Sequence, residues 1–61
     1  MNRIVFEIPN NYSESWAIDI TGQDIVPIIG DTVIHKGIRY KVLDRQFCYT
    51  SQIILLTLKK K

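Results

Sequence analysis

The stretch PIIGDTVIHKGIRYKV, residues Pro27–Val42, decides the fold that this sequence predicts. Across 38–43 the side chains on one face of an extended chain are all apolar, while two of the three on the other face are basic, which is typical of a half-buried strand. A shorter strand is predicted at 32–35, and Lys36-Gly37 between the two is a tight turn in which glycine supplies a positive φ. We therefore predict a β-hairpin, which the chain enters through a second turn at Gly30-Asp31.

Two further strands are predicted upstream of this hairpin. In residues 3–8 every second position is isoleucine or phenylalanine, so one face is expected to be buried. Trp16–Ile20 has the same period, although Ser13 is also a suitable cap for a short helix over 14–19. The period of two favours a strand, and the short connection favours antiparallel pairing with the first strand. The pair Ile25-Val26 is too short to assign.

The C-terminal third is predicted to complete the sheet. Asp44-Arg45-Gln46 indicates a bend or bulge, after which residues 47–49 continue in extended form. Thr50-Ser51-Gln52 then turns the chain into a last strand, Ile53–Leu58, and Lys59–Lys61 is predicted to be a frayed, solvated tail. The last strand is apolar on both faces, which indicates that it is central in a sheet or covered at an interface.

Together these elements predict one small all-β domain over residues 1–61. Five or six short antiparallel strands cannot bury two opposed faces as a flat sheet, whereas a sheet that curls on itself covers one face and removes most of its exposed edge. We therefore expect a small SH3-like barrel. Since the single cysteine allows no internal disulfide, apolar packing or a partner subunit has to supply the stability.

Turn glycines and core positions in the second half of the chain form a recognisable pattern, which runs Pro27-x-x-Gly30-Asp31-x-Val33, Gly37-x-x-Tyr40-x-Val42 and Arg45-x-Phe47. This pattern resembles that of short single-domain open reading frames of bacteria, prophages and phages that have an SH3-like barrel. The resemblance implies a fold and a setting, namely binding modules and accessory proteins that often have no assigned activity. It carries no catalytic residue onto this chain, and function inferred from the fold would be analogy.

Nothing in the sequence predicts an enzyme, a cofactor, a metal site or a small-molecule substrate. His35, the only histidine, stands beside a turn without a predicted partner, so we expect it to be exposed and structural. Cys48 is expected to be a small buried hydrophobe, the alternative being a reactive thiol if it is exposed. The acidic residues show no recognisable metal-ligand spacing. The lone cysteine and the absence of a secretory or membrane-spanning pattern predict a cytoplasmic protein that does not contact membranes.

The leading hypothesis for function is a non-enzymatic module that binds another protein or a second copy of itself, in the setting of a phage or mobile-element accessory protein. It depends on the last strand, which is apolar on both faces in a chain too short to cover both. Trp16 is alternatively expected to close one end of the core. The residues predicted for such an interface are Ile53, Leu55, Trp16 and Tyr12.

The alternative hypothesis is a small nucleic-acid-binding barrel. Residues 1–31 contain one basic and five acidic side chains (net −4), whereas residues 32–61 contain seven basic and one acidic (net +6). This split favours a basic face, although we expect the two halves to interleave in space and largely neutralise each other. Basic residues would contact phosphates and a ring would stack on a base. The predicted contact residues are Lys36, Arg39, Lys41, Arg45 and Tyr49.

Overall fold

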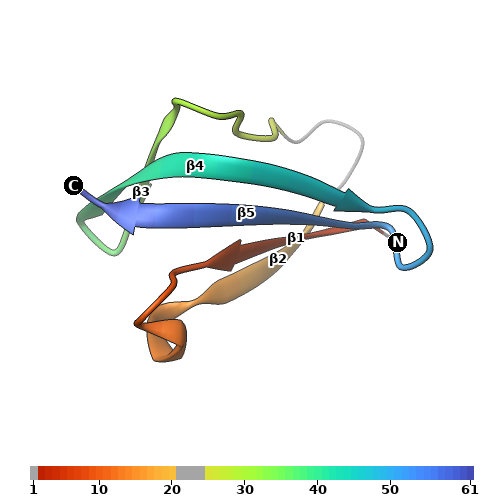
Figure 1. The fold of residues 1–61 in the computed structure, drawn as a ribbon, viewed down its shortest axis with the longest axis horizontal. Coiled ribbons are helices and arrows are strands. Elements are labelled where there is room, and N and C mark those ends of the chain that lie inside the picture. Colours follow the sequence, from red (N-terminus) through yellow and green to blue (C-terminus); the bar gives the residue numbers. More distant parts are fainter. Residues whose placement is uncertain (1, 21–24) are drawn as a thin grey trace.

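One five-stranded sheet forms the body of the structure, a computed structural model that describes residues 2–20 and 25–61. Its elements along the chain are β1 (Asn2–Glu7), a 3₁₀ turn (Tyr12–Glu14), β2 (Trp16–Ile20), β3 (Thr32–His35), β4 (Ile38–Cys48) and β5 (Ile53–Lys60). Within the sheet the strands follow the order β2-β1-β5-β4-β3, and Figure 1 shows β5 lying between β4 and β1.

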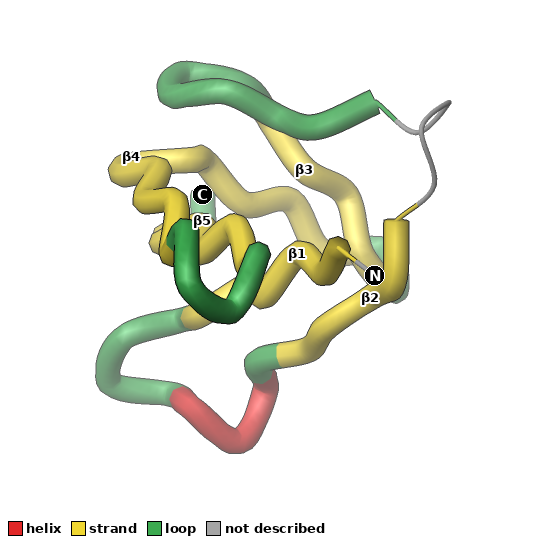
Figure 2. The backbone as a smooth tube through the Cα atoms, turned by 90° about the vertical axis from the view of Figure 1, so that its right-hand side faces the viewer, coloured by secondary structure: helices red, strands yellow, loops and turns green. Residues whose placement is uncertain are grey.

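The sheet curls into a half-barrel, and the prediction of a small all-β barrel-like fold is confirmed. Figure 2, an end-on view, shows the strands bending round a shared interior, while the segment that leads into β3 runs alongside β3 and β4 at the top of the view. Val26 in that segment packs against the core, and the pair Ile25-Val26 forms no strand. The core lies on the inner face of the sheet and consists of Ile4, Phe6, Ile8, Tyr40, Val42, Leu56 and Leu58.

The predicted antiparallel pairing of the first two strands is confirmed, with Ile4 opposite Ile18 and Phe6 opposite Trp16. The alternative helix over 14–19 does not form, because only Tyr12–Glu14 is helical and the chain is extended from Trp16 onwards. The backbone N–H of Ile8 donates to the hydroxyl of Ser15 at 3.0 Å, so a side-chain contact ties the connection to the end of β1.

The pairing of β1 with β5 is parallel, which departs from the prediction of antiparallel strands throughout. Its register places Ile4 beside Ile54 and Phe6 beside Leu56, so the first and last strands supply neighbouring core residues. A parallel pair needs a long crossover, and here β2, β3 and β4 together form that connection. Patterns of neighbouring residues predict hairpins but contain no information about a contact between the two ends of the chain.

The central hairpin forms as predicted, with Val33 opposite Tyr40 and His35 opposite Ile38. Both residues of its turn have positive φ, 52° at Lys36 and 78° at Gly37. Two positive φ angles are what a type I′ turn requires, and that turn matches the right-handed twist of the two strands it joins. Lysine in the left-handed region is unfavourable, so the fold imposes this conformation on Lys36.

A β-bulge at Leu43 reverses the faces of the second half of β4. Val42 lies opposite Leu58, but Asp44 lies opposite Thr57, so one extra residue is inserted between them. Directly opposed residues point to the same face of a sheet, and beyond the bulge it is therefore Arg45, opposite Leu56, that shares the inner face. A bend or bulge was predicted at 44–46, and the irregularity lies just before it.

The prediction that Cys48 is buried is wrong, and the bulge is the reason. Cys48 lies opposite Ile53 at the far end of β4 and is exposed. In a strand without the extra residue, alternate side chains point to the same face, so Cys48 would face the core together with Tyr40 and Val42. The inserted residue moves it to the solvent side, an outcome that depends on strand register and not on hydrophobicity.

Lys59 and Lys60 belong to β5, which corrects the prediction that Lys59–Lys61 is a frayed tail. Lys59 lies opposite Lys41 on β4, and the backbone N–H of Lys61 donates to the carbonyl oxygen of Arg39 at 3.0 Å. The start of β4 thus provides backbone partners for the whole C-terminus. Lysine has a low strand propensity, but a ladder partner outweighs that preference.

An aromatic stack links the two edge strands of the sheet. The Trp16 ring of β2 lies between Phe6, at a centroid distance of 4.6 Å, and the His35 imidazole of β3, at 3.8 Å, with interplanar angles of 14° and 7°. The expectation that Trp16 closes one end of the core agrees with this position. His35 is half-buried against the indole instead of exposed, because its register puts it on the inner face.

The turn conformation leads to a test of hairpin stability. We expect Lys36→Asn to stabilise the fold by roughly 1 kcal/mol, because asparagine tolerates the left-handed region better than lysine does. Gly37→Ala should destabilise it by about 1–2 kcal/mol. A Cβ at Gly37 would meet no atom within 4 Å, so this cost is backbone strain and not a clash. Urea unfolding followed by circular dichroism measures both, and equal stability of the two variants would contradict the assignment.

Candidate functional site

The outer face of the sheet, opposite the core, is not covered by any other described part of the chain. Three apolar side chains lie side by side across its first three strands, because Ala17 of β2 is opposite Val5 of β1 and Val5 is beside Leu55 of β5. We call these three residues the apolar row. Ile53 precedes Leu55 on the same face, and Val5, Leu55 and Ile53 are half-buried by their neighbours alone.

Charged and polar residues border the apolar row on both sides. On one side Glu7 of β1 lies beside Thr57 of β5, which is opposite Asp44 of β4, and we call these three residues the acidic row. On the other side Arg3 and Asp19 are opposite one another and form an ion pair of 3.1 Å between Nε and Oδ1. The outer face therefore has an apolar centre and a polar border.

Beyond the acidic row, four cations gather on the outer face at the end that holds the C-terminus and the β3–β4 turn (Figure 1). Lys41 lies directly opposite Lys59, and Lys61 pairs through its backbone with Arg39. The Nζ of Lys61 donates to the hydroxyl of Thr32 at 2.6 Å. We call Arg39, Lys41, Lys59 and Lys61 the basic end.

None of these four cations has an acidic partner among the residues that the structure describes. The ion pairs found in that part of the chain join Arg3 to Asp19 and, at 3.7 Å, Lys60 to Glu14. Lys60 points to the inner face, opposite Tyr40, and so does not belong to the basic end. Like charges placed directly opposite on neighbouring strands, as Lys41 and Lys59 are, destabilise a sheet.

The structure separates the residues predicted to bind nucleic acid. Arg39 and Lys41 are on the outer face, whereas Arg45 follows the bulge and is on the inner face. Tyr49 is 83% exposed and meets Phe47 edge-to-face at 5.9 Å, but both lie near the opposite end of β4 from Arg39. The predicted set therefore does not form one surface in which rings alternate with cations.

The predicted interface residues also divide into separate places. Ile53 and Leu55 lie together on the outer face, Trp16 is on the inner face, and Tyr12 is exposed in the 3₁₀ turn. Sequence reasoning missed Val5 and Ala17, which complete the apolar row. Their apolar character in the outward positions of β1 and β2 was the available signal, but only the register of three strands brings them beside Leu55.

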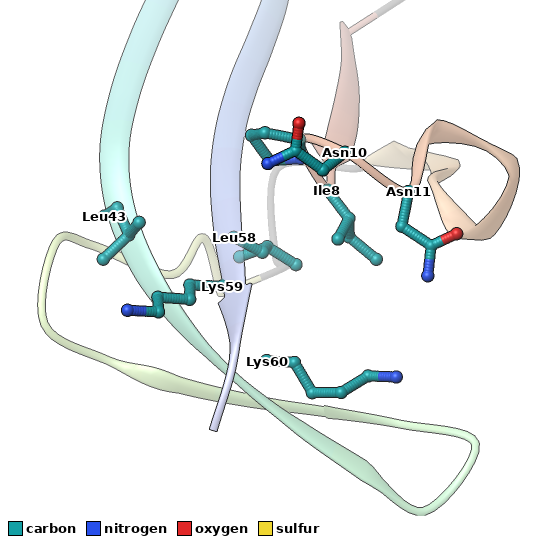
Figure 3. A pocket seen from close by; sticks show the side chains of 8 residues that line it. Ile8, Asn10, Asn11, Leu43, Leu58, Lys59 and Lys60 are labelled. Atoms are coloured by element: carbon teal, nitrogen blue, oxygen red, sulfur yellow. The ribbon is translucent and has the colours of Figure 1, made fainter.

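A depression of about 460 Å³ lies where β1 ends and β5 continues (Figure 3). Its lining residues are Ile8, Pro9, Asn10, Asn11, Leu43, Leu58, Lys59 and Lys60. Figure 3 shows the side chains of Lys59 and Lys60 extending from β5 in opposite directions, so their amines do not converge on one point. Apart from the two lysine amines, the lining contains no acid, histidine or cysteine.

A second depression, of about 300 Å³, adjoins the aromatic stack and includes Glu14, Trp16, His35 and Lys36 in its lining. Both ring faces of Trp16 are already occupied, by Phe6 and by His35. The carboxylate of Glu14 is engaged by Lys60. A ligand here would meet the edges of the stacked rings and a carboxylate that Lys60 already engages.

Two further features are absent from residues 2–20 and 25–61. No group of three or more histidine, cysteine, aspartate or glutamate side chains is placed to hold a metal ion. No helix in those residues combines the length and the apolar character that crossing a membrane requires.

No protein-family model matches this chain, and neither a curated protein nor a solved structure gives a match to it. Its function is therefore inferred from the surface that the fold produces.

Cys48 places an exposed thiol on the outer face. Hydrogen bonds from Ser51, first from its backbone N–H and then from its hydroxyl, stabilise the thiolate and lower the pKa of the Cys48 thiol. Because the thiolate is the nucleophile, a lowered pKa means that more of this thiol reacts at neutral pH than of an ordinary cysteine.

We expect Cys48 to be alkylated by iodoacetamide in the folded protein, with a pH midpoint below that of a free cysteine. Ser51→Ala removes the hydroxyl but keeps the backbone donor, so it should move the midpoint part of the way back up. Mass spectrometry of samples quenched at intervals measures the rate. A native thiol that reacts only after unfolding would contradict the exposed position.

Proposed function

We propose that this chain is a small non-enzymatic binding module that acts through protein–protein contact, and that its outer face pairs with a second copy of the chain. The observation that carries the proposal is the apolar row on an uncovered face. Single exposed apolar side chains are normal on protein surfaces, but a contiguous row across three strands is typical of an interaction site.

The arrangement of the outer face supports an interface. Protein interfaces have an apolar centre and a polar rim, and here the apolar row lies between the acidic row and the Arg3–Asp19 pair. A specific interface buries about 800 Å² on each partner. The Cα atoms extend over 29 × 23 × 19 Å, so the outer face is large enough to supply an area of that order.

Charge favours a second copy as the occupant. A two-fold axis that runs along the apolar row would lay Val5 and Leu55 on their counterparts and reverse the direction of each strand. On β1 the outward residues are Arg3, Val5 and Glu7, so this operation brings Arg3 of one copy over Glu7 of the other. Such an isologous contact needs one patch that is complementary to itself.

The cellular setting is part of the same proposal. The pattern of turn glycines and core positions that resembles short phage and bacterial reading frames supports an accessory protein of a phage or mobile element. An exposed free thiol at Cys48 supports a reducing compartment such as the cytoplasm. Genes of phage structure or regulation beside the coding sequence are the expected observation.

Two neighbouring leucines give a matched test of the interface. Leu55 points outward and is half-buried, whereas Leu56 points inward and is fully buried at 0% exposure. We expect Leu55→Glu to abolish self-association while the fold is kept, and Leu56→Glu to unfold the chain because it buries a charge in the core. Size-exclusion chromatography with light scattering, together with circular dichroism, distinguishes these results.

The native chain should have twice the 7.1 kDa mass of one copy at high micromolar concentration. Glu7→Lys should weaken the dimer, since it places a lysine against Arg3 of the other copy. A native protein that stays at the mass of one chain at that concentration would refute the dimer. Unfolding of Leu55→Glu would instead place Leu55 in the core.

A further inference from the structure

The basic end brings four positive charges together, although like charges on neighbouring strands destabilise a sheet. Lys41 and Lys59 are directly opposed, a geometry in which the Cβ atoms are about 4.5–5.5 Å apart. Arg39 lies two residues from Lys41 on the same face, and Lys61 is tied to the backbone of Arg39 and to the hydroxyl of Thr32. Four cations on one surface, without an acidic partner in the described residues, create a local positive potential that attracts anions.

The acidic row lies between this surface and the apolar row, which is the centre of the proposed dimer contact. Glu7 and Asp44 flank Thr57, which lies two residues before Lys59 on the same face of β5. Their carboxylates repel an anionic partner, so they limit its contact to the basic end. In the proposed two-fold pairing the basic end projects past the edge of the contact, because the apolar row lies nearer the other end of the sheet.

The surroundings of the four cations indicate which anionic partner fits. A protein partner is held by large apolar anchors at the centre of the contact, aromatic ones above all. The exposed apolar side chains beside these cations are Ile34, opposite Arg39, and Leu43, which lines a depression with Lys59, and neither is aromatic. Single-stranded nucleic acid needs rings for stacking, and Phe47 and Tyr49 lie near the other end of β4. Contact with the phosphates of a duplex needs cations and polar donors alone.

We propose that the basic end binds the phosphate backbone of duplex nucleic acid without reading its sequence. This goes beyond protein contact and uses a different part of the outer face. The residues that bind phosphate are Arg39, Lys41, Lys59 and Lys61, and Arg45 and Tyr49 take no part. Four phosphate contacts give a slope of about −3.5 in log affinity against log salt concentration.

Lys59→Glu and Arg45→Glu form a matched pair for the experiment. Both residues are exposed and both substitutions change the net charge equally, but only Lys59 belongs to the basic end. Fluorescence anisotropy with a short labelled DNA duplex of mixed sequence, repeated over a range of salt concentrations, measures the binding of each variant.

We expect Lys59→Glu to weaken duplex binding about tenfold or more and to make the salt slope shallower by at least about 1, while Arg45→Glu stays within about twofold of the native protein. Lys59→Glu should also raise the melting temperature, because it replaces opposed like charges with an opposite-charge pair beside Lys41. A Lys59→Glu variant with a higher melting temperature is folded, so unfolding is then excluded as the cause of its weaker binding.

Three outcomes would overturn the proposal. Equal losses in the two variants would mean that only net charge matters. A single strand that binds more tightly than the duplex would indicate base stacking. Polyglutamate that displaces the duplex at equal charge concentration would assign the basic end to an acidic protein. The dimer is measured separately by mass, so each proposal can fail without the other.

Discussion

The parallel ladder between β1 and β5 is the contact on which the rest of the structure depends. The other pairings, β1 with β2, β3 with β4 and β4 with β5, join strands that follow one another along the chain. Only the register of Arg3–Glu7 with Ile53–Thr57 unites these two groups in one sheet. Closing so long a loop costs conformational entropy, which the burial of Ile4, Phe6 and Leu56 against one another offsets.

The unequal lengths of these two strands determine where charge accumulates. Pairing β1 with β5 brings the acidic and basic halves of the chain together, and by itself this would neutralise much of their charge. However, β1 ends at Glu7, opposite Thr57, whereas β5 continues to Lys60. The last residues of β5 therefore pair with β4 alone. The outward residues of β4 at this point are Arg39 and Lys41, so Lys59 lies directly opposite another lysine.

A single curled layer leaves one face of the sheet in contact with solvent, and the strand register sorts that face into successive rows. The apolar row, the acidic row and the basic end follow one another along the strands, so the proposed dimer contact and the proposed phosphate contact depend on different residues. The bulge at Leu43 contributes by turning Arg45 and Phe47 to the inner side of β4. The outer face beyond the bulge is thus free of rings.

The all-β class, the central hairpin with its Lys36-Gly37 turn, the strand at Trp16–Ile20 and most of the core could be predicted from the sequence. These features follow from period-two patterning and turn chemistry, which act between residues close in sequence. The parallel β1–β5 pairing, the ordered lysines of β5 and the outward position of Cys48 could not be predicted in this way. Each depends on which residue of a distant strand lies opposite, and one inserted residue at Leu43 is enough to exchange the two faces.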